Sequence, residues 1–168
     1  MPRQVDQSCS CKSRKVLPIS DSGADNGVSG KNSRVISDIA TAPRATLRGF
    51  DAVLAKKKGL PIVDVLNKVT VERIDGNVAS KYQCIVRLNQ MVLNETEQDS
   101  LWSEYQIRDA GFVLDSVAKH HKKDHKGNMG TQALHLNKMD RIPFVVNRGL
   151  MTIEIEYPTD EDIAKLTN

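Results

Sequence analysis

Aromatic side chains are scarce in this chain of 168 residues, in which three Phe, three Tyr and one Trp make up 4% of the composition. Proteins that read single-stranded RNA or DNA commonly stack the bases on clustered aromatic rings. The composition therefore disfavours RNA-recognition sheets and single-strand-binding barrels. We expect any contact with nucleic acid to depend on charge rather than on stacking.

Cysteine is rare too, and the three cysteines, Cys9, Cys11 and Cys84, are an odd number. Two of them lie in a stretch that has the composition of a disordered segment, so they form no disulfide framework, and a reducing compartment fits the sequence. Cys9 and Cys11 also lack the second pair of ligands that a structural zinc site requires. Palmitoylation beside the neighbouring basic residues is an alternative role for them.

Long apolar runs and catalytic motifs are missing as well. No window approaches about 18 consecutive apolar residues, the length that a membrane-spanning helix requires. The sequence contains no Gly-x-Ser-x-Gly, no P-loop, no Rossmann glycine pattern and no His-Glu-x-x-His. Glu154 and Glu156 are spaced to share one face of a strand, which is more often a solvated face than an acid/base pair. We therefore predict a protein that is not an enzyme and that binds no cofactor or small-molecule substrate.

Positive charge is concentrated in the N-terminal third of the chain. Residues 1–58 hold eleven Lys and Arg against five Asp, a net charge of +6, whereas residues 59–168 hold thirteen basic and sixteen acidic side chains, a net charge of −3. A basic segment of this kind attracts polyanions, either nucleic acid or an anionic membrane surface. A merely solvated tail is the simpler alternative.

The predicted domain organisation follows from the apolar content. Residues 1–42 are poor in large apolar side chains, and Ser20–Gly30 is a cluster of turn-forming residues, so we predict a disordered basic arm. Residues 43–168 should form one small α+β domain, in which an antiparallel sheet packs against one or two helices.

The first element expected in this domain is a helix over residues 43–58. Pro43 suits a helix start, and Gly59 follows a final turn rich in lysine, whose charge suits the negative end of the helix dipole. The apolar residues that fall on one face at helical spacing are Leu47, Phe50 and Leu54.

Two β-hairpins are expected from alternating apolar and polar residues. In the first, residues 69–74 and 81–88 flank a turn that contains Gly76. In the second, residues 143–146 and 150–157 flank a turn that contains Gly149. Both pairs favour antiparallel sheet structure.

Further elements are expected after residue 100. An apolar stripe that begins at Leu101 indicates a helix that ends near Gly111 and leads into a strand over residues 112–118. A single longer helix through His121 is the alternative. The acidic run that begins at Asp160 should open a short C-terminal helix, because acidic side chains suit a helix N-terminus.

Residues 119–130 carry four lysines and three histidines and should form an exposed basic loop. His121 and His125 could share one face of a helix and bind zinc. The neighbouring lysines would repel a divalent cation, however, and Gly127 and Gly130 disfavour a rigid helix. We therefore predict a basic loop without a metal.

Candidate binding residues follow from the charge pattern. We predict that three groups of basic residues bind a polyanion, namely Lys12, Arg14, Lys15, Lys56, Lys57, Lys58, Lys119, Lys122, Lys123 and Lys126. Weak, open-ended self-association is assigned to Trp102, Glu154 and Glu156, where Trp102 is either a core residue or an interface anchor. The two glutamates would attract the basic arm of another copy.

Two stretches resemble the matrix proteins of rhabdoviruses, particularly the short ones of plant-infecting members. The run Ile142–Tyr157, followed by acidic residues 160–162, is similar to the penultimate strands of that fold. Upstream, Lys68–Arg73 resembles a strand that precedes a Trp-containing helix and a further strand in the family's order.

The resemblance implies a viral structural protein that self-associates and bridges the ribonucleoprotein, or RNA, to the anionic inner face of a membrane. Its expected locations are the virion, the host cytoplasm and host membranes, with the nucleus as a further location. The budding motifs Pro-Pro-x-Tyr and Pro-Thr-Ala-Pro are missing, so recruitment of host budding machinery is not implied. A small viral coat protein or an RNA-binding accessory protein, whose basic arm neutralises RNA, is the alternative.

Overall fold

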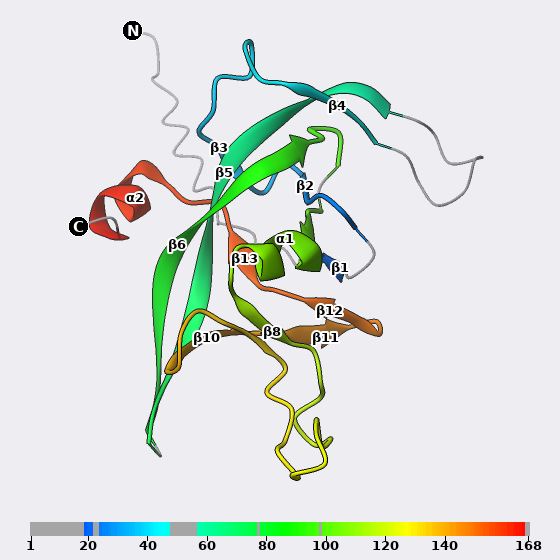
Figure 1. Ribbon diagram of the computed structural model, residues 1–168. Coiled ribbons are helices and arrows are strands. Elements are labelled where there is room, and N and C mark those ends of the chain that lie inside the picture. Colours follow the sequence, from blue (N-terminus) through cyan, green and yellow to red (C-terminus); the bar gives the residue numbers. More distant parts are fainter. Residues whose placement is uncertain (1–18, 22–23, 48–56, 77, 98, 167–168) are drawn as a thin grey trace, which may run out of the picture.

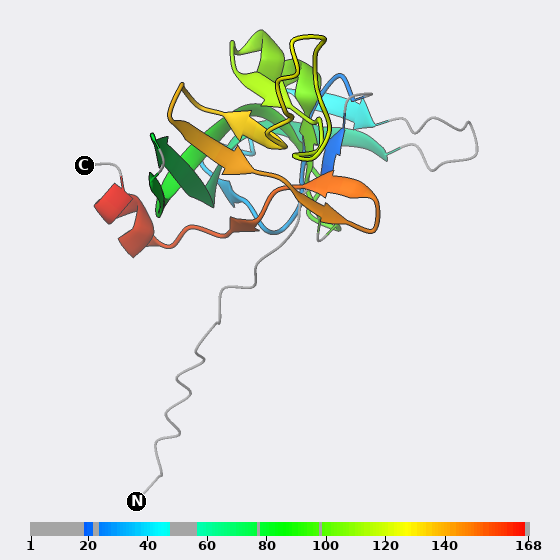
Figure 2. The same cartoon turned by 90° about the horizontal axis from the view of Figure 1, so that it is seen from below.

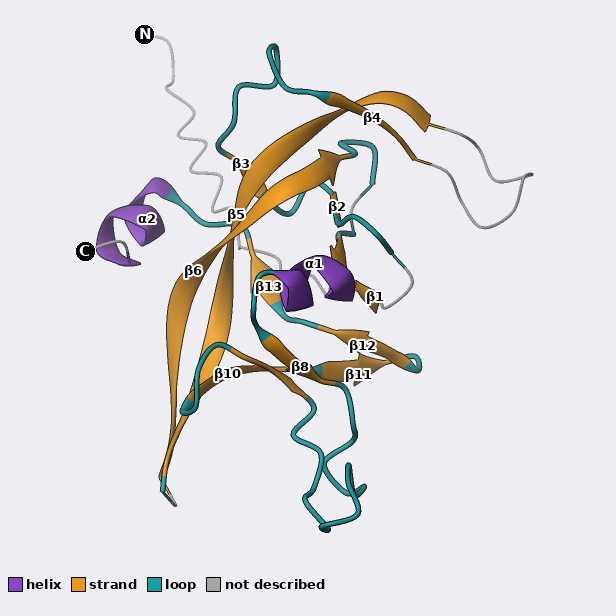
Figure 3. Cartoon of the chain, viewed as in Figure 1, coloured by secondary structure: helices purple, strands orange, loops and turns teal. Residues whose placement is uncertain are grey.

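The computed structural model describes residues 19–21, 24–47, 57–76, 78–97 and 99–166. Within them, thirteen strands join in one sheet, and only two short helices are present (Figures 1 and 3). The predicted α+β class is therefore wrong, because the fold is mostly β and the sheet curls into a half-barrel instead of packing against helices. The strands are β1 (Ile19–Asp21), β2 (Val28–Ser29), β3 (Arg34–Val35), β4 (Arg44–Leu47), β5 (Lys57–Asp75), β6 (Val78–Leu93), β7 (Leu101–Ser103), β8 (Val113–Asp115), β9 (Ala133–His135), β10 (Asp140–Pro143), β11 (Val145–Asn147), β12 (Leu150–Thr152) and β13 (Ile155–Glu156), and the helices are α1 (Glu104–Asp109) and α2 (Asp160–Leu166).

The longest elements, β5 and β6, form one extended hairpin. Its register runs without a shift from the Asp75↔Val78 pair to the Val65↔Leu88 pair. Gly76 in the connection has a positive φ of 58°, as a tight hairpin turn requires. Alternate residues of β5 are buried on one face, namely Val63, Val65, Asn67, Val69 and Val71. The first predicted hairpin is confirmed, and it is longer than the sequence indicated.

The sheet turns back on itself through its last strands. From β12 the hydrogen-bonded order runs through β1, β7, β2 and β6 to β5, and β13, which follows β12 after two residues, also pairs with β5. Ile153 lies between those two strands and is 1% exposed, while Ile155 in β13 is 0% exposed. Both belong to a core cluster that includes Trp102 and Ile142. The core thus lies inside the curl of the sheet.

Part of the predicted arm belongs to the folded domain. β2 pairs with β6 and β7, and β3 pairs with β5, so residues 24–42 contribute to the sheet. This stretch is polar, but its buried groups bond to one another: Ser100 Oγ donates to Asn32 Oδ1 (2.6 Å), and Gly30 N donates to Ser100 Oγ (3.0 Å). The prediction weighed apolar area alone and missed the order that hydrogen bonds between buried polar groups allow. Residues 1–18 and 22–23 of the predicted arm lie outside the described residues.

The helix predicted over residues 43–58 does not form where this segment is described. Residues 44–47 are strand β4, which pairs with β5 through contacts such as Ala45↔Leu60. The edge of β5 offers backbone hydrogen bonds along its length, whereas an isolated helix of this size is only marginally stable. Residues 48–56, which include Phe50 and Leu54, lie outside the described residues.

Both helices begin with recognisable start signals. Ser103 is the N-cap of α1, where its hydroxyl accepts a hydrogen bond from Gln106 N (3.2 Å). α1 ends at Asp109 and β8 follows, so a helix and then a strand form instead of a single longer helix, but the helix begins at Glu104, because Leu101–Ser103 is strand β7. α2 starts with three acidic residues, as predicted. The second predicted hairpin is found in part as β11 and β12, whereas its expected second strand over residues 150–157 ends at Thr152, and β13 pairs with β5 instead.

Replacing Ile155 by alanine tests this account of the core. Ile155→Ala should lower the free energy of unfolding by about 2–5 kcal/mol, because it removes a fully buried side chain from the closure of the sheet. Val78→Ala is the control, since Val78 is 68% exposed at the tip of the long hairpin and should change stability by less than about 0.5 kcal/mol. Denaturant unfolding measures both, and equal effects would contradict the core assignment.

Candidate polyanion-binding and self-association surfaces

The basic loop was expected over residues 119–130; because β8 ends at Asp115, the loop extends over residues 116–130, and one buried carboxylate anchors it. Asp115, at the end of β8, accepts hydrogen bonds from Val117 N (3.0 Å), Thr131 N (3.0 Å) and Thr131 Oγ1 (2.9 Å), and it pairs with Lys123 Nζ (3.3 Å). Burial alone would raise the pKa of this carboxyl group, but the hydrogen bonds from Thr131 and Val117 outweigh burial and lower the pKa. Asp115 therefore holds both ends of the loop with a fixed negative charge.

Backbone contacts give the loop a defined shape. Lys123 N donates to Asn128 O (2.8 Å), and Asn128 N and Nδ2 donate to the carboxylate of Asp124 (3.1 and 2.7 Å). A Cβ atom on Gly130 would clash with the carbonyl oxygen of Val117, so the two ends of the loop approach each other as closely as only glycine permits. The predicted exposed loop is confirmed, and Figure 1 shows it in yellow at the lower end of the molecule.

Three of the four predicted loop lysines are exposed and make no ion pair within the described part of the chain. They are Lys119, Lys122 and Lys126. Lys123 instead pairs with Asp115 and helps to order the loop. Because the loop is already folded, its exposed ammonium groups can contact phosphates without a large cost in conformational entropy.

The lysine cluster at residues 56–58 has a different environment. Lys57 Nζ lies 3.0 Å from Glu97 Oε1 and 2.8 Å from Thr96 Oγ1, so its charge is used within the domain. Lys58 is exposed. This part of β5 lies at the opposite end of the molecule from the basic loop in Figure 1, so the two clusters do not form one surface. The predicted binding residues that lie outside the described residues are Lys12, Arg14, Lys15 and Lys56.

The histidines of the basic loop form no metal centre with other ligands in the ranges that the structure describes. His135 in β9 is part of the network around Asp115. Its Nε2 lies 2.7 Å from Thr131 Oγ1, and because the threonine hydroxyl donates its only proton to Asp115, the Nε2–H of His135 is the donor. Burial, and next the charge of Arg141, lower the pKa of His135. His135 thus supports the anchor as a neutral donor.

The residues predicted to mediate self-association are largely engaged within the subunit. Trp102 is 2% exposed and belongs to the core, so it cannot anchor a second copy. Glu156 contacts Lys68 Nζ (3.2 Å), which also contacts Asp162 (3.1 Å). Burial opposes the charge on Lys68, but its hydrogen bonds to Asp162 and Glu156 outweigh burial and raise the pKa. Glu154 is exposed. Lys68 in β5 therefore holds α2 through Asp162, and Glu156 shares the same lysine.

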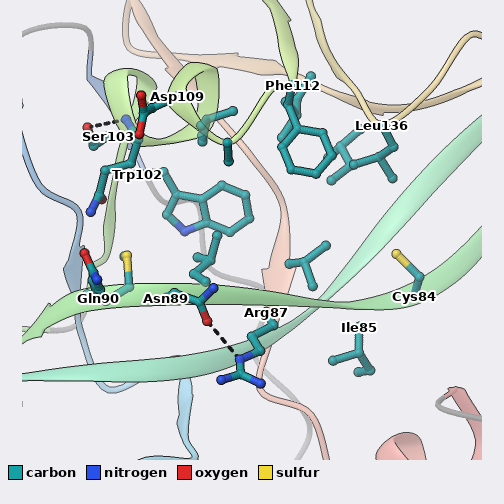
Figure 4. Close-up of a pocket in the computed structure, with 18 residues that line it drawn as sticks. Cys84, Ile85, Arg87, Asn89, Gln90, Trp102, Ser103, Asp109, Phe112 and Leu136 are labelled. Carbon is teal, nitrogen blue, oxygen red and sulfur yellow. Dashed lines mark hydrogen bonds between the residues drawn. The ribbon is translucent and has the colours of Figure 1, made fainter.

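An apolar groove with a volume of about 600 Å³ opens between β6 and α1. Figure 4 shows Phe112 and Leu136 on one side of it and β6 on the other, with the indole of Trp102 between α1 and β6. Sequence reasoning missed this surface. The alternating apolar residues of β6 indicate one apolar face, but nothing in the sequence shows that this face lacks a covering element.

Comparison of the chain with protein-family models, with curated proteins and with solved structures gives no match. Neither α1 nor α2, the helices of the described ranges, has the length and apolar character that crossing a membrane requires. The function therefore has to be inferred from the surfaces of this chain.

Removal of the loop anchor should have a measurable and pH-dependent cost. Asp115→Ala should lower the free energy of unfolding by about 1–3 kcal/mol at neutral pH, because buried donors lose their acceptor. The lowered pKa of Asp115 means that its contribution is present above the ordinary aspartate value of about 3.9 and is lost as the pH falls through the folded-state value. Unfolding curves of the variant and the wild type should therefore converge in acid.

The matched control is Asp99→Ala, which removes an exposed carboxylate. Its stability should stay within about 0.5 kcal/mol of wild type at every pH. A constant difference between Asp115→Ala and wild type down to strongly acidic pH would show that the carboxylate charge is not what anchors the loop.

Proposed function

We propose that this protein is a viral structural protein of the matrix type, which self-associates and bridges a ribonucleoprotein to the inner face of a membrane. The observation that carries the proposal is the separation of two kinds of surface on one small domain. Exposed lysines gather on the ordered basic loop, whereas an apolar groove lies uncovered beside β6. A bridging protein needs both, because it must bind polyanions and other copies of itself at the same time.

The basic loop suits a phosphate-rich partner that is recognised by charge alone. Residues 116–130 contain no Phe, Tyr or Trp, so apart from the imidazoles of His120, His121 and His125 the loop offers no ring on which a base could stack. Lysine ammonium groups act as point charges toward phosphates, whether these belong to RNA or to lipid headgroups. The expected binding is strongly salt-dependent and has little sequence preference.

The segment that carries the family resemblance supports the same proposal. Residues 142–157 include β11 and β12, which pair around Arg148 and Gly149. Both turn residues have positive φ values, 51° and 83°, as the two-residue hairpin turn of this type requires. The resemblance and the lysine surface together favour a matrix protein.

A small viral coat protein is the second candidate, because the described part of the chain is mostly β and does not form the sheet packed on a helix that was expected of a matrix domain. The two candidates differ in their partners. A coat protein has to bind RNA alone, whereas a matrix protein also has to bind an anionic bilayer.

Neutralising two loop lysines tests the polyanion surface. Lys122→Gln with Lys126→Gln should weaken binding to phosphatidylserine-containing vesicles by about 2 kcal/mol, roughly thirtyfold, at about 1 kcal/mol for each charge near the surface. Binding to a homopolymeric single-stranded RNA should also weaken, and the magnitude of the slope of log K against log salt should fall by about 1.4. Vesicle co-sedimentation and fluorescence anisotropy measure these quantities.

The matched control is Lys31→Gln with Lys138→Gln, which removes the same charge from exposed positions outside the loop. It should bind close to wild type. Equal losses of affinity in both variants would show that binding depends on net charge alone, and would contradict a specific role for the basic loop. Binding to RNA without binding to anionic vesicles would favour the coat protein.

A further inference from the structure

One long edge of β6 is without a strand partner in the described residues. β6 pairs with β5 over nearly its whole length, but on its other side it pairs only with β2, at Val92 and Leu93. Asp75 and Val78 flank a two-residue turn and form a hydrogen-bonded pair. Hydrogen-bonded and non-hydrogen-bonded pairs alternate along the hairpin from there, and the Lys68↔Ile85 pair is a non-hydrogen-bonded one. The backbone N–H and C=O of Ile85 therefore point away from β5.

The apolar groove follows this open edge. Eight consecutive residues of β6, from Cys84 to Met91, line it. The lining therefore includes Ile85, whose backbone groups point away from β5, together with core-facing side chains such as Val86 and Leu88. The opposite wall includes Ile107, which is buried, and Phe112, which is 42% exposed at the rim. The groove thus combines unpaired backbone groups with an apolar wall, as sites for an added strand do.

The second open edge is β11, which pairs only with β12 among the described strands. Phe144 N donates to Gln132 O (2.9 Å), and two residues further on, the N–H of Val146 points to the same side, where no described strand continues. Val146 is 55% exposed, and Leu150 on β12 is 48% exposed. Figure 2 shows this hairpin, in orange, projecting from the body of the domain. The hairpin thus presents exposed apolar side chains beside a strand edge that no described strand covers.

We propose that the β11–β12 hairpin of one subunit docks into the β6 groove of a second copy, where β11 adds as a strand beside Ile85. The groove accepts apolar side chains, and β11 carries no charged residue that would have to be desolvated. The two surfaces lie on different parts of the same molecule, so each copy offers one of each. Contacts of this head-to-tail kind need not close and propagate into open-ended assemblies.

This interface rests on the proposed function, since it supplies the self-association that a matrix protein requires, and it replaces the charge-based contact predicted from Glu154 and Glu156. An apolar strand-addition contact differs from an ionic one in its response to salt. Its affinity should be maintained or increase at high salt, because salt screens ion pairs but does not weaken the burial of apolar surface.

Three aspartate substitutions test the interface by sedimentation velocity of the full chain. Val146→Asp places a charge on the hairpin, Phe112→Asp places one at the groove rim, and Val78→Asp is the control at a more exposed valine outside both surfaces. The first two should weaken self-association by about a hundredfold, because an unpaired charge would be buried. The control should associate as wild type does, and thermal unfolding should show all three folded.

A mixture of the two interface variants gives the sharpest result. Val146→Asp keeps an intact groove and Phe112→Asp keeps an intact hairpin, so the mixture should form heterodimers and no larger species, although neither variant associates alone. Self-association that is unaffected by either substitution would overturn the interface while leaving the proposed function standing. Loss of association without heterodimers in the mixture would overturn the head-to-tail geometry. A wild-type chain that remains monomeric at high concentration, with and without RNA or anionic vesicles, would overturn the proposed function itself.

Discussion

The pairing of β5 with β6 is the interaction on which the rest of the structure depends. One edge of β5 is occupied by β6, and the other is shared by four short strands in succession, β4, β3, β13 and β10. Strands of two to four residues have little stability of their own. They become ordered because the long strand presents backbone groups in a fixed register. Among the described strands, only β2 pairs with the outer edge of β6, and this asymmetry leaves the groove open.

Hydrogen bonds and ion pairs of buried polar side chains stabilise parts of the fold that a larger apolar core would stabilise in other proteins. Asn67 is fully buried in β5, where its side-chain amide donates to Ser33 Oγ (2.9 Å) and to Asn32 O (3.3 Å). Asp115 anchors the basic loop in a similar way, and Lys68 holds α2. Each buried polar group stabilises the fold only while its hydrogen-bond partners are in place, because an unsatisfied polar group inside a protein costs free energy. These requirements fix the positions of the basic loop and of α2, although the chain is rich in Ser, Asn and Asp.

Local patterns in the sequence predicted both hairpins, the basic loop and the short C-terminal helix, because turn glycines and alternation act between near neighbours. The fold class was wrong, since curling of the sheet depends on which distant strands meet, such as β13 with β5, and no local pattern encodes that. Trp102 shows that the same limit applies to the candidate site. A tryptophan at this position is compatible with either the core or an interface, and only the packing of the folded chain shows that it belongs to the core. The open edges of β6 and β11 could not be predicted, because an edge is defined by the strand that is missing beside it.

Amide hydrogen exchange of the full-length chain, measured at low and at high protein concentration, tests the central claim that uncovered strand edges carry assembly. The account predicts that the amides of Ile85 and Val146 exchange rapidly in dilute protein and become protected together as the protein associates. Amides at the tip of the long hairpin, such as that of Ala79, which also face away from β5, should stay unprotected. Protection on association that appears elsewhere in the chain and spares both Ile85 and Val146 would contradict the account.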